Sequence, residues 1–110
     1  MDISILDSGK VSVVKVKGHV GSETASDLEA ALKQLLEANK FHIVLDLKEV
    51  DVLSSLGLRA IVVTHKSARR VNGDLRLASP SPAVEKVLRT VGMMQMFDIY
   101  SSSEEAVASF

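Results

Sequence analysis

The stretch Phe41–Arg70, FHIVLDLKEVDVLSSLGLRAIVVTHKSARR, carries the strongest signals for the fold class of this chain. Its first part, Ile43–Leu47, is an almost continuous apolar run, which predicts a strand buried on both faces. A charged connection, Lys48-Glu49, and a short apolar piece, Val50–Leu53, lead to two serines and then to an apolar helical segment. The serines therefore lie where a buried strand passes into a helix, which is where α/β folds usually place functional groups.

The residues before this stretch predict two strands and one helix. Ile3–Leu6 and Val11–Val16 are apolar or β-branched, and the turn residues between them favour a hairpin. The glycines of Gly18–Ser22 indicate a loop with positive φ or a close backbone approach. Leucines at i, i+4 and i+7 then predict an amphipathic helix with Ser22 as its N-cap and its end near Ala38.

The helix predicted after the two serines covers Leu56–Val71, and its second half is basic. Lys66, Arg69 and Arg70 suit a helix C-terminus, where the helix dipole favours cations. A solvated end that complements the dipole is therefore the favoured interpretation, ahead of a binding patch.

The last third of the chain predicts two short strands and two further helices. Leu75–Leu77 alternates with a charged residue, as a strand does, and residues 81–92 begin with Ser-Pro and end with Gly, as a helix does. The methionines that follow are expected to fill gaps in the core. Asp98–Tyr100 is predicted as an edge strand, and Ser102 or Ser103 as the N-cap of a last short helix.

This order of elements predicts a single α/β domain, with four to five strands in a mixed sheet and about four helices packed against it. The length of 110 residues suits one core, and the formal net charge of −1 gives no reason to expect nucleic acid or an anionic membrane as a partner. The chain has no cysteine, no recognisable signal peptide and no apolar run long enough to span a membrane. A cytoplasmic protein is expected.

Catalytic and metal-binding patterns are absent from the sequence. His19, His42 and His65 share no metal-ligand spacing, so surface or strand-end positions are expected for them. A Ser–His–Asp set would pair Ser55 with His65, but the helix would separate them by about 15 Å along its axis. There is also no phosphate-binding glycine loop, so neither an enzyme nor a cofactor site is expected.

The serine turn has two interpretations. In the simpler one, Ser54 or Ser55 is an N-cap and has no further role. In the other, Ser55 accepts a phosphate, because the first backbone N–H groups of a helix have no internal partners and the helix dipole favours negative charge there. Gly57 is expected to leave room for a partner to approach the turn closely.

The chain resembles the STAS domain, specifically the bacterial anti-sigma factor antagonists that work by partner switching. The segment GHVGSETASDLEAAL, residues 18–32, is similar to the first loop and helix of that family. The segment IVLDLKEVDVLSSLGLRAIV, residues 43–62, is similar to its central strand, phosphorylation turn and next helix. NGDLRLASPSPAVEKVLRTVGM, residues 72–93, is similar to the strand and helix that follow. Three such segments in the right order are fairly specific, and the resemblance implies a STAS domain over residues 1–110.

The resemblance implies that Ser55 is a phosphorylation site. Unmodified protein would bind an ATP-dependent anti-sigma factor serine kinase and free the sigma factor, phosphorylation would separate the two proteins, and a PP2C-type phosphatase would reverse the modification. The antagonist would have no catalysis of its own and would be a monomer or weak dimer. The implied partner-binding residues are Gly21, Ser22, Glu23, Ser54, Ser55, Leu56, Gly57 and Arg59.

Three positions depart from the common pattern of the family. Ser54 replaces a frequent aspartate, and Gly21 replaces an aspartate that often meets a basic residue of the kinase, which leaves Glu23 as a candidate substitute. Leu56 is larger than the usual serine or alanine. It either adds an apolar contact for a partner or packs beneath the helix, and packing is the favoured expectation.

Two other functions stay open at this point. One is a structural or scaffolding STAS module, or a partner-switching regulator of a target other than a sigma factor, without phosphorylation. The other is a small-ligand binder or minor enzyme that uses a pocket near Gly21 and Ser55.

Overall fold

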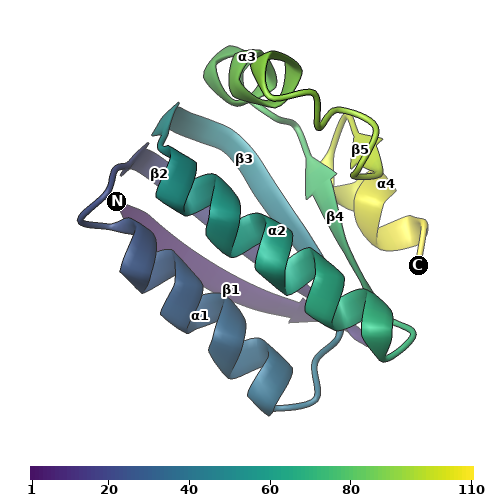
Figure 1. Cartoon of the computed structure of the whole chain (residues 1–110). Helices are drawn as coiled ribbons and strands as arrows, with labels where there is room; N and C mark the ends of the chain where they lie inside the picture. Colours follow the sequence, from purple (N-terminus) through teal and green to yellow (C-terminus); the bar gives the residue numbers. More distant parts are fainter.

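The chain alternates strands and helices almost from end to end in the computed structural model, which describes residues 1–110 (Figure 1). The elements are β1 (Asp2–Ser8), β2 (Val11–Val20), α1 (Ala25–Glu37), β3 (His42–Leu53), α2 (Ser55–Arg70), β4 (Asp74–Ala78), α3 (Pro82–Thr90), β5 (Ile99–Tyr100) and α4 (Ser103–Ala108). This is the predicted order, and each predicted element is present.

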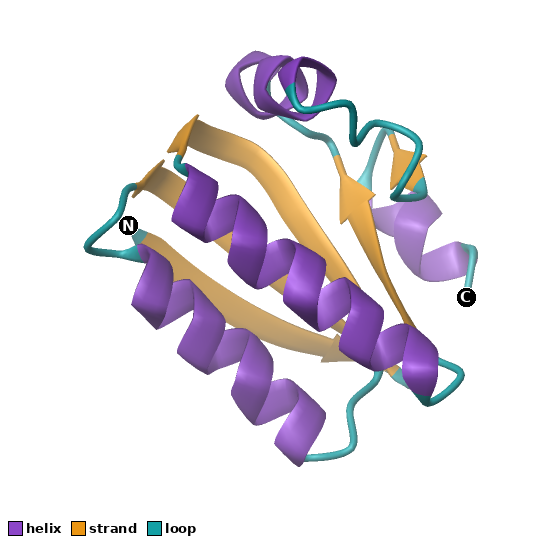
Figure 2. Cartoon of the chain, in the orientation of Figure 1, coloured by secondary structure: helices purple, strands orange, loops and turns teal.

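The sheet has five strands in the order β1-β2-β3-β4-β5. β1 is antiparallel to β2, and the other neighbours are parallel, so the predicted mixed α/β sheet is confirmed. α1 and α2 lie side by side over one face of the sheet, and α4 lies on the other side (Figure 2). The main core fills the space beneath α1 and α2, and a smaller apolar cluster lies beneath α4.

β3 is one strand of 12 residues, so the break predicted at Lys48-Glu49 is wrong. Both charged side chains are exposed, and the register between β2 and β3 shifts by one residue beside them, between Lys15 and Lys17. A register shift accommodates an extra residue without ending the pairing. A second shift occurs at Gly18, whose φ of 98° lies inside β2, so the predicted loop begins only after Val20.

α1 begins at Ala25 with Thr24 at its N-cap position, so the predicted cap at Ser22 is also wrong. The turn before α1 is closed instead by Thr24, whose Oγ1 accepts a hydrogen bond from the Gly21 amide at 2.9 Å. The Ala25 amide donates to the Gly21 carbonyl at 2.9 Å. These bonds leave Ser22 and Glu23 exposed on the outside of the turn.

His65 is buried, which contradicts the expectation of a surface or strand-end position. Position 65 falls on the side of α2 that faces the sheet, where the ring lies edge-on to Phe97 at a centroid distance of 4.8 Å. Its Nδ1 lies 3.1 Å from the Leu75 carbonyl oxygen and 3.4 Å from Oδ1 of Asp74. His65 therefore helps to seat α2 on the start of β4.

Several predicted details at the C-terminal end are confirmed. Ser81 caps α3 with Pro82 in the first turn, and Ser102 caps α4. The methionines after α3 are partly buried against the main core, and Phe97 is buried in it. The Ser81 hydroxyl also donates to the Val50 carbonyl at 2.6 Å, so the cap ties α3 to the middle of β3.

We expect Ser81→Ala to lower the free energy of unfolding by about 1–3 kcal/mol, because the cap of the Val84 amide and the buried bond to Val50 are both lost. Urea denaturation measures this change. Ser22→Ala is the matched control, since the Ser22 side chain is exposed and caps nothing. It should change stability by less than about 0.5 kcal/mol. An equal loss in both variants would contradict the placement of the α1 start.

Candidate functional site

The loop before α1 and the serine turn before α2 meet at one end of the sheet. β2 and β3 are parallel neighbours, and Val20 pairs with Leu53 at the ends of the two strands. The Ser54 amide continues this pairing by donating to the Val20 carbonyl at 2.8 Å. The structure therefore brings together the two segments, 21–23 and 54–59, that contain all the predicted partner-binding residues.

Of the two serines that could cap α2, Ser54 is the N-cap. Its Oγ accepts a hydrogen bond from the Gly57 amide at 3.2 Å, and its carbonyl accepts the Leu58 amide at 3.0 Å. The amides of Ser55 and Leu56 have no acceptor within the chain. Ser55 is the first helical residue and is exposed, and its hydroxyl forms no hydrogen bond within the chain.

Gly57 does not leave room for a partner, and that expectation is wrong. The glycine is buried, and a Cβ atom at this position would lie 2.6 Å from Cγ1 of Val20 and 3.0 Å from Cδ1 of Leu53. The missing side chain allows the first turn of α2 to rest directly on the ends of β2 and β3. Gly57 therefore positions the serine turn from below and offers no surface to a partner.

Leu56 and Arg59 both face solvent. Leu56 is 49% exposed, so the expectation that it packs beneath the helix is wrong. Arg59 lies one turn after Ser55 and is also exposed. Residues four apart share one face of a helix, so the serine hydroxyl and the guanidinium lie on the same side of α2.

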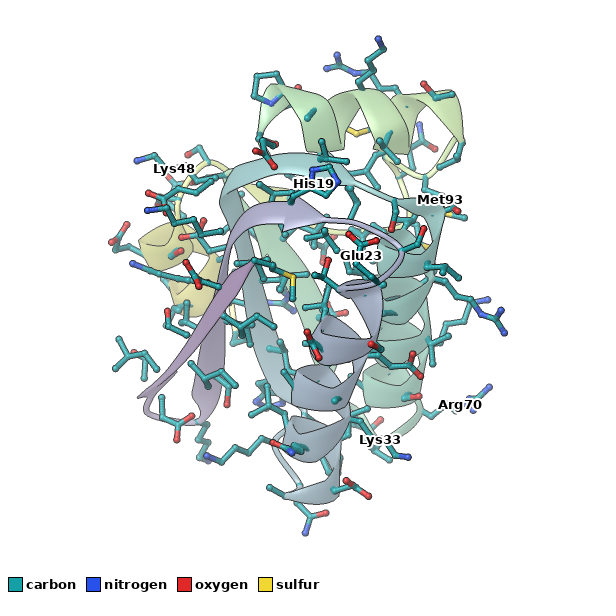
Figure 3. The ribbon with its side chains drawn as sticks, turned by 90° about the vertical axis from the view of Figure 1, so that its left-hand side faces the viewer. His19, Glu23, Lys33, Lys48, Arg70 and Met93 are labelled. Atoms are coloured by element: carbon teal, nitrogen blue, oxygen red, sulfur yellow. The ribbon has the colours of Figure 1, made fainter.

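The loop from β2 to α1 adds a second polar group to this end of the molecule. Gly21 is buried, and a Cβ there would lie 3.1 Å from Oε1 of Glu23 and 3.1 Å from Cδ2 of His19. The glycine thus allows both side chains to close over the backbone, which confirms the close approach expected for this segment. Figure 3 shows His19 and Glu23 together above α1. His19 lies two residues before Gly21, exposed near the end of β2, which is the surface or strand-end position expected for it.

No enclosed pocket forms around Gly21 and Ser55 among the cavities described. A cavity of about 600 Å³ lies elsewhere, between β2, β3 and the N-terminus of α4, and Lys15, Asp46 and Ser103 are among its lining residues. The structure contains no cluster of side chains that could hold a metal ion. None of the helices has the length and apolar character that a membrane crossing requires. Ser55, Leu56 and Arg59 are exposed, and none of the described cavities is lined by them.

These features define a small α/β domain whose distinctive surface is the junction of two loops at the carboxyl ends of parallel strands. The family model of the STAS domain matches residues 2–106. A Bordetella bronchiseptica protein named "Putative anti-sigma factor antagonist BtrV" is 36% identical over 95 residues, which cover 86% of this chain and 82% of that protein. The chain belongs to the STAS domain family and, within it, to the anti-sigma factor antagonists.

Solved structures share this fold over nearly the whole chain. An anti-sigma factor antagonist from Mycobacterium paratuberculosis superposes with a TM-score of 0.88 at 26% identity, covering 98% of this chain and 92% of the other. The antagonist SpoIIAA in its unphosphorylated form gives a TM-score of 0.84 at 18% identity, covering 96% and 93%. The phosphorylated Bacillus SpoIIAA gives 0.79 at 16% identity, covering 98% of each chain. Because the two SpoIIAA structures are only 18% and 16% identical to this chain, they establish similarity of fold and nothing further.

We expect Gly57→Ala to destabilise the protein by about 1–3 kcal/mol, because the new methyl group forces Val20 and Leu53 out of place. Combining it with Val20→Ala removes the atom at 2.6 Å, so the double variant should lose less stability than the sum of the two single changes. Urea denaturation of the four proteins measures this coupling. Full stability in Gly57→Ala would contradict the close contact.

Proposed function

We propose that this chain is an anti-sigma factor antagonist of the partner-switching type. Unmodified protein binds an anti-sigma factor serine kinase and so releases the sigma factor, and phosphorylation of Ser55 ends that binding. The observation that carries the proposal is that Ser54, and not Ser55, caps α2. The exposed Ser55 hydroxyl therefore has no structural role.

The start of α2 suits a phosphate on Ser55 for two physical reasons. The unpartnered amides of Ser55 and Leu56 lie beside the hydroxyl and are donors that a phosphate oxygen accepts. The helix dipole also favours negative charge at this end, and a phosphate carries about −1.5 to −2 charges at neutral pH. Modification therefore adds charge at the surface without disturbing the cap, the strand pairing or the core.

The solved structures are consistent with a fold that tolerates this change. SpoIIAA has been described in unphosphorylated and phosphorylated forms, and both superpose on this chain with TM-scores of 0.84 and 0.79. In this proposal, phosphorylation of Ser55 likewise acts on the contact surface rather than on the fold. A kinase docked over Ser55 and Leu56 would meet a dianion where it had met a hydroxyl and an apolar side chain.

The remaining parts of the proposal follow from partner switching. The exposed Ser22 and Glu23 form the second half of the kinase-binding surface above the buried Gly21, with the Glu23 carboxylate in place of an aspartate at position 21. A PP2C-type phosphatase removes the phosphate and restores binding. The chain supplies a substrate serine and a surface but no catalytic group, and it works in the cytoplasm as a monomer or weak dimer.

Incubation with ATP and an anti-sigma factor kinase from the same genome should add one phosphate to the intact protein. Mass spectrometry measures this change, and Ser55→Ala should abolish it. Ser54→Ala is the matched control: it removes the neighbouring hydroxyl but leaves the acceptor, so it should still gain one phosphate. An unchanged mass of the wild-type protein with a demonstrably active kinase would refute the switch and leave a scaffolding role.

Binding of the same kinase should depend on charge at position 55. Ser55→Ala should bind as tightly as unmodified protein in the presence of ATP and should resist release. Ser55→Asp should bind at least about tenfold more weakly, because docking would bury an unpaired negative charge at the centre of the contact. Isothermal titration calorimetry compares the variants. Equal affinity of both variants would show that negative charge at this turn is not what separates the proteins.

A further inference from the structure

The solvent face of α2 carries a row of two apolar and three basic residues. Its members follow each other at intervals of three and four residues and are exposed: Leu56, Arg59, Val63, Lys66 and Arg70. Such intervals place side chains in one row along a helix. The row, here called the α2 stripe, is about 21 Å long and begins beside Ser55. Figure 3 shows Arg70 at its far end, projecting away from α2.

The apolar members of the α2 stripe are too exposed to serve the core. Leu56 is 49% exposed and Val63 is 52% exposed, although the opposite side of the helix is packed against the sheet. They lie two turns apart, about 10.5 Å along the axis. Two apolar side chains at this distance match the repeat of apolar residues along one face of a second helix.

The basic members are not used by the protein itself. α2 contains no acidic residue, and of its lysines and arginines only Arg69 forms an ion pair, with Asp74 at 3.6 Å. Arg59, Lys66 and Arg70 have no carboxylate within 4.0 Å. The helix dipole accounts for cations in the last turn but not for Arg59, the fifth residue of the helix. A solvated, dipole-complementing end therefore explains only part of this charge.

We propose that the α2 stripe is a docking surface for an acidic amphipathic helix of a protein partner. The partner helix would place apolar residues two turns apart against Leu56 and Val63, with carboxylates facing Arg59, Lys66 and Arg70. Charge complementarity of this kind sets orientation and on-rate, and the apolar contacts supply area.

Two other occupants, a second copy of the chain and an anionic membrane, fit the α2 stripe less well. A second copy of the chain would bring α2 against α2 and place like charges opposite each other. A flat anionic membrane would also meet α1, which lies alongside α2 (Figure 1) and exposes Asp27, Glu29 and Glu37. α1 itself forms no ion pair with α2. A helix is narrow enough to follow α2 while avoiding these carboxylates.

One consequence rests on the proposed function at Ser55. A phosphate there would lie one turn from Arg59 on the same face, the spacing at which opposite charges pair along a helix. The phosphate would then compete with a carboxylate of the partner for Arg59. Phosphorylation would thus act on the α2 stripe itself as well as on the turn.

The docking surface can be tested without any kinase, which separates it from the proposed function. The probe is a synthetic helical peptide with leucines seven residues apart flanked by glutamates, titrated into unmodified ¹⁵N-labelled protein. We expect amide chemical-shift changes concentrated in Leu56–Arg70, with affinity that falls as salt rises. The same peptide with lysines in place of the glutamates should produce no such changes.

Charge reversal identifies the residues responsible. The double variant Arg59→Glu/Lys66→Glu should weaken binding of the glutamate peptide by about fivefold or more, and Arg59→Gln/Lys66→Gln should weaken it less. Lys33→Glu is the matched control, because Lys33 is an exposed lysine on the neighbouring α1. It should bind as wild type does. Ser55→Asp should weaken binding in the same direction as the charge reversals.

Three outcomes would overturn the proposal. The first is equal binding of the glutamate and lysine peptides, and the second is full binding by both double variants. The third is cosedimentation of the protein with phosphatidylserine vesicles that the Arg59→Glu/Lys66→Glu variant loses, which would assign the α2 stripe to a membrane. In each case phosphorylation of Ser55 by a kinase could still be found, so the two proposals fail independently.

Discussion

The contact between the start of α2 and the end of β2 is the constraint on which the rest of this site depends. Gly57 rests on Val20 so closely that even a methyl group would not fit, and the Ser54 amide bonds to the Val20 carbonyl. A helix start held from below by packing and from the side by a strand has little freedom to move. Ser55 is therefore presented to solvent by a rigid support, which is what a surface read by another protein requires.

Ser54 caps the helix, and the adjacent Ser55 provides an exposed hydroxyl. A single serine at the N-cap could not provide both. The hydroxyl oxygen of an N-cap serine normally accepts a hydrogen bond from a backbone amide. Modifying that hydroxyl would remove a cap that stabilises the protein by about 1 kcal/mol. Here Ser54 makes that bond and Ser55 makes none. In the proposed switch, a phosphate on Ser55 would bind the free amides of the first turn instead of displacing the cap. The proposed modification would thus leave the cap intact, and its effect would be confined to the surface that a partner contacts.

Local sequence signals predicted most of the fold. The features that they did not predict depend on contacts between residues far apart in the sequence. The Ser-Pro start of α3 and the order of strands and helices depend on near neighbours, and both were predicted correctly. The role of Gly57 depends on Val20, which no pattern within one helix reveals. The spacing of His65 from Leu58 and Ile61 places it on the buried face of α2, and only its partners Phe97 and Leu75 lie beyond the reach of a local pattern. The exposure of Ser55 became clear only once the structure had assigned the cap to Ser54.

The magnitude of the charge effect shows that electrostatics alone would make an incomplete switch. Two unit charges about 6 Å apart in water interact by about 0.7 kcal/mol, so a phosphate of charge −2 near one partner carboxylate costs about 1.4 kcal/mol, or about a tenfold loss of affinity. Physiological salt reduces this further. A decisive change of partner therefore requires that the phosphate also lose its hydration in the interface. Because Leu56 is apolar and adjoins Ser55, a docked protein would cover this position, and burial of the dianion there would be far more costly than its repulsion across water.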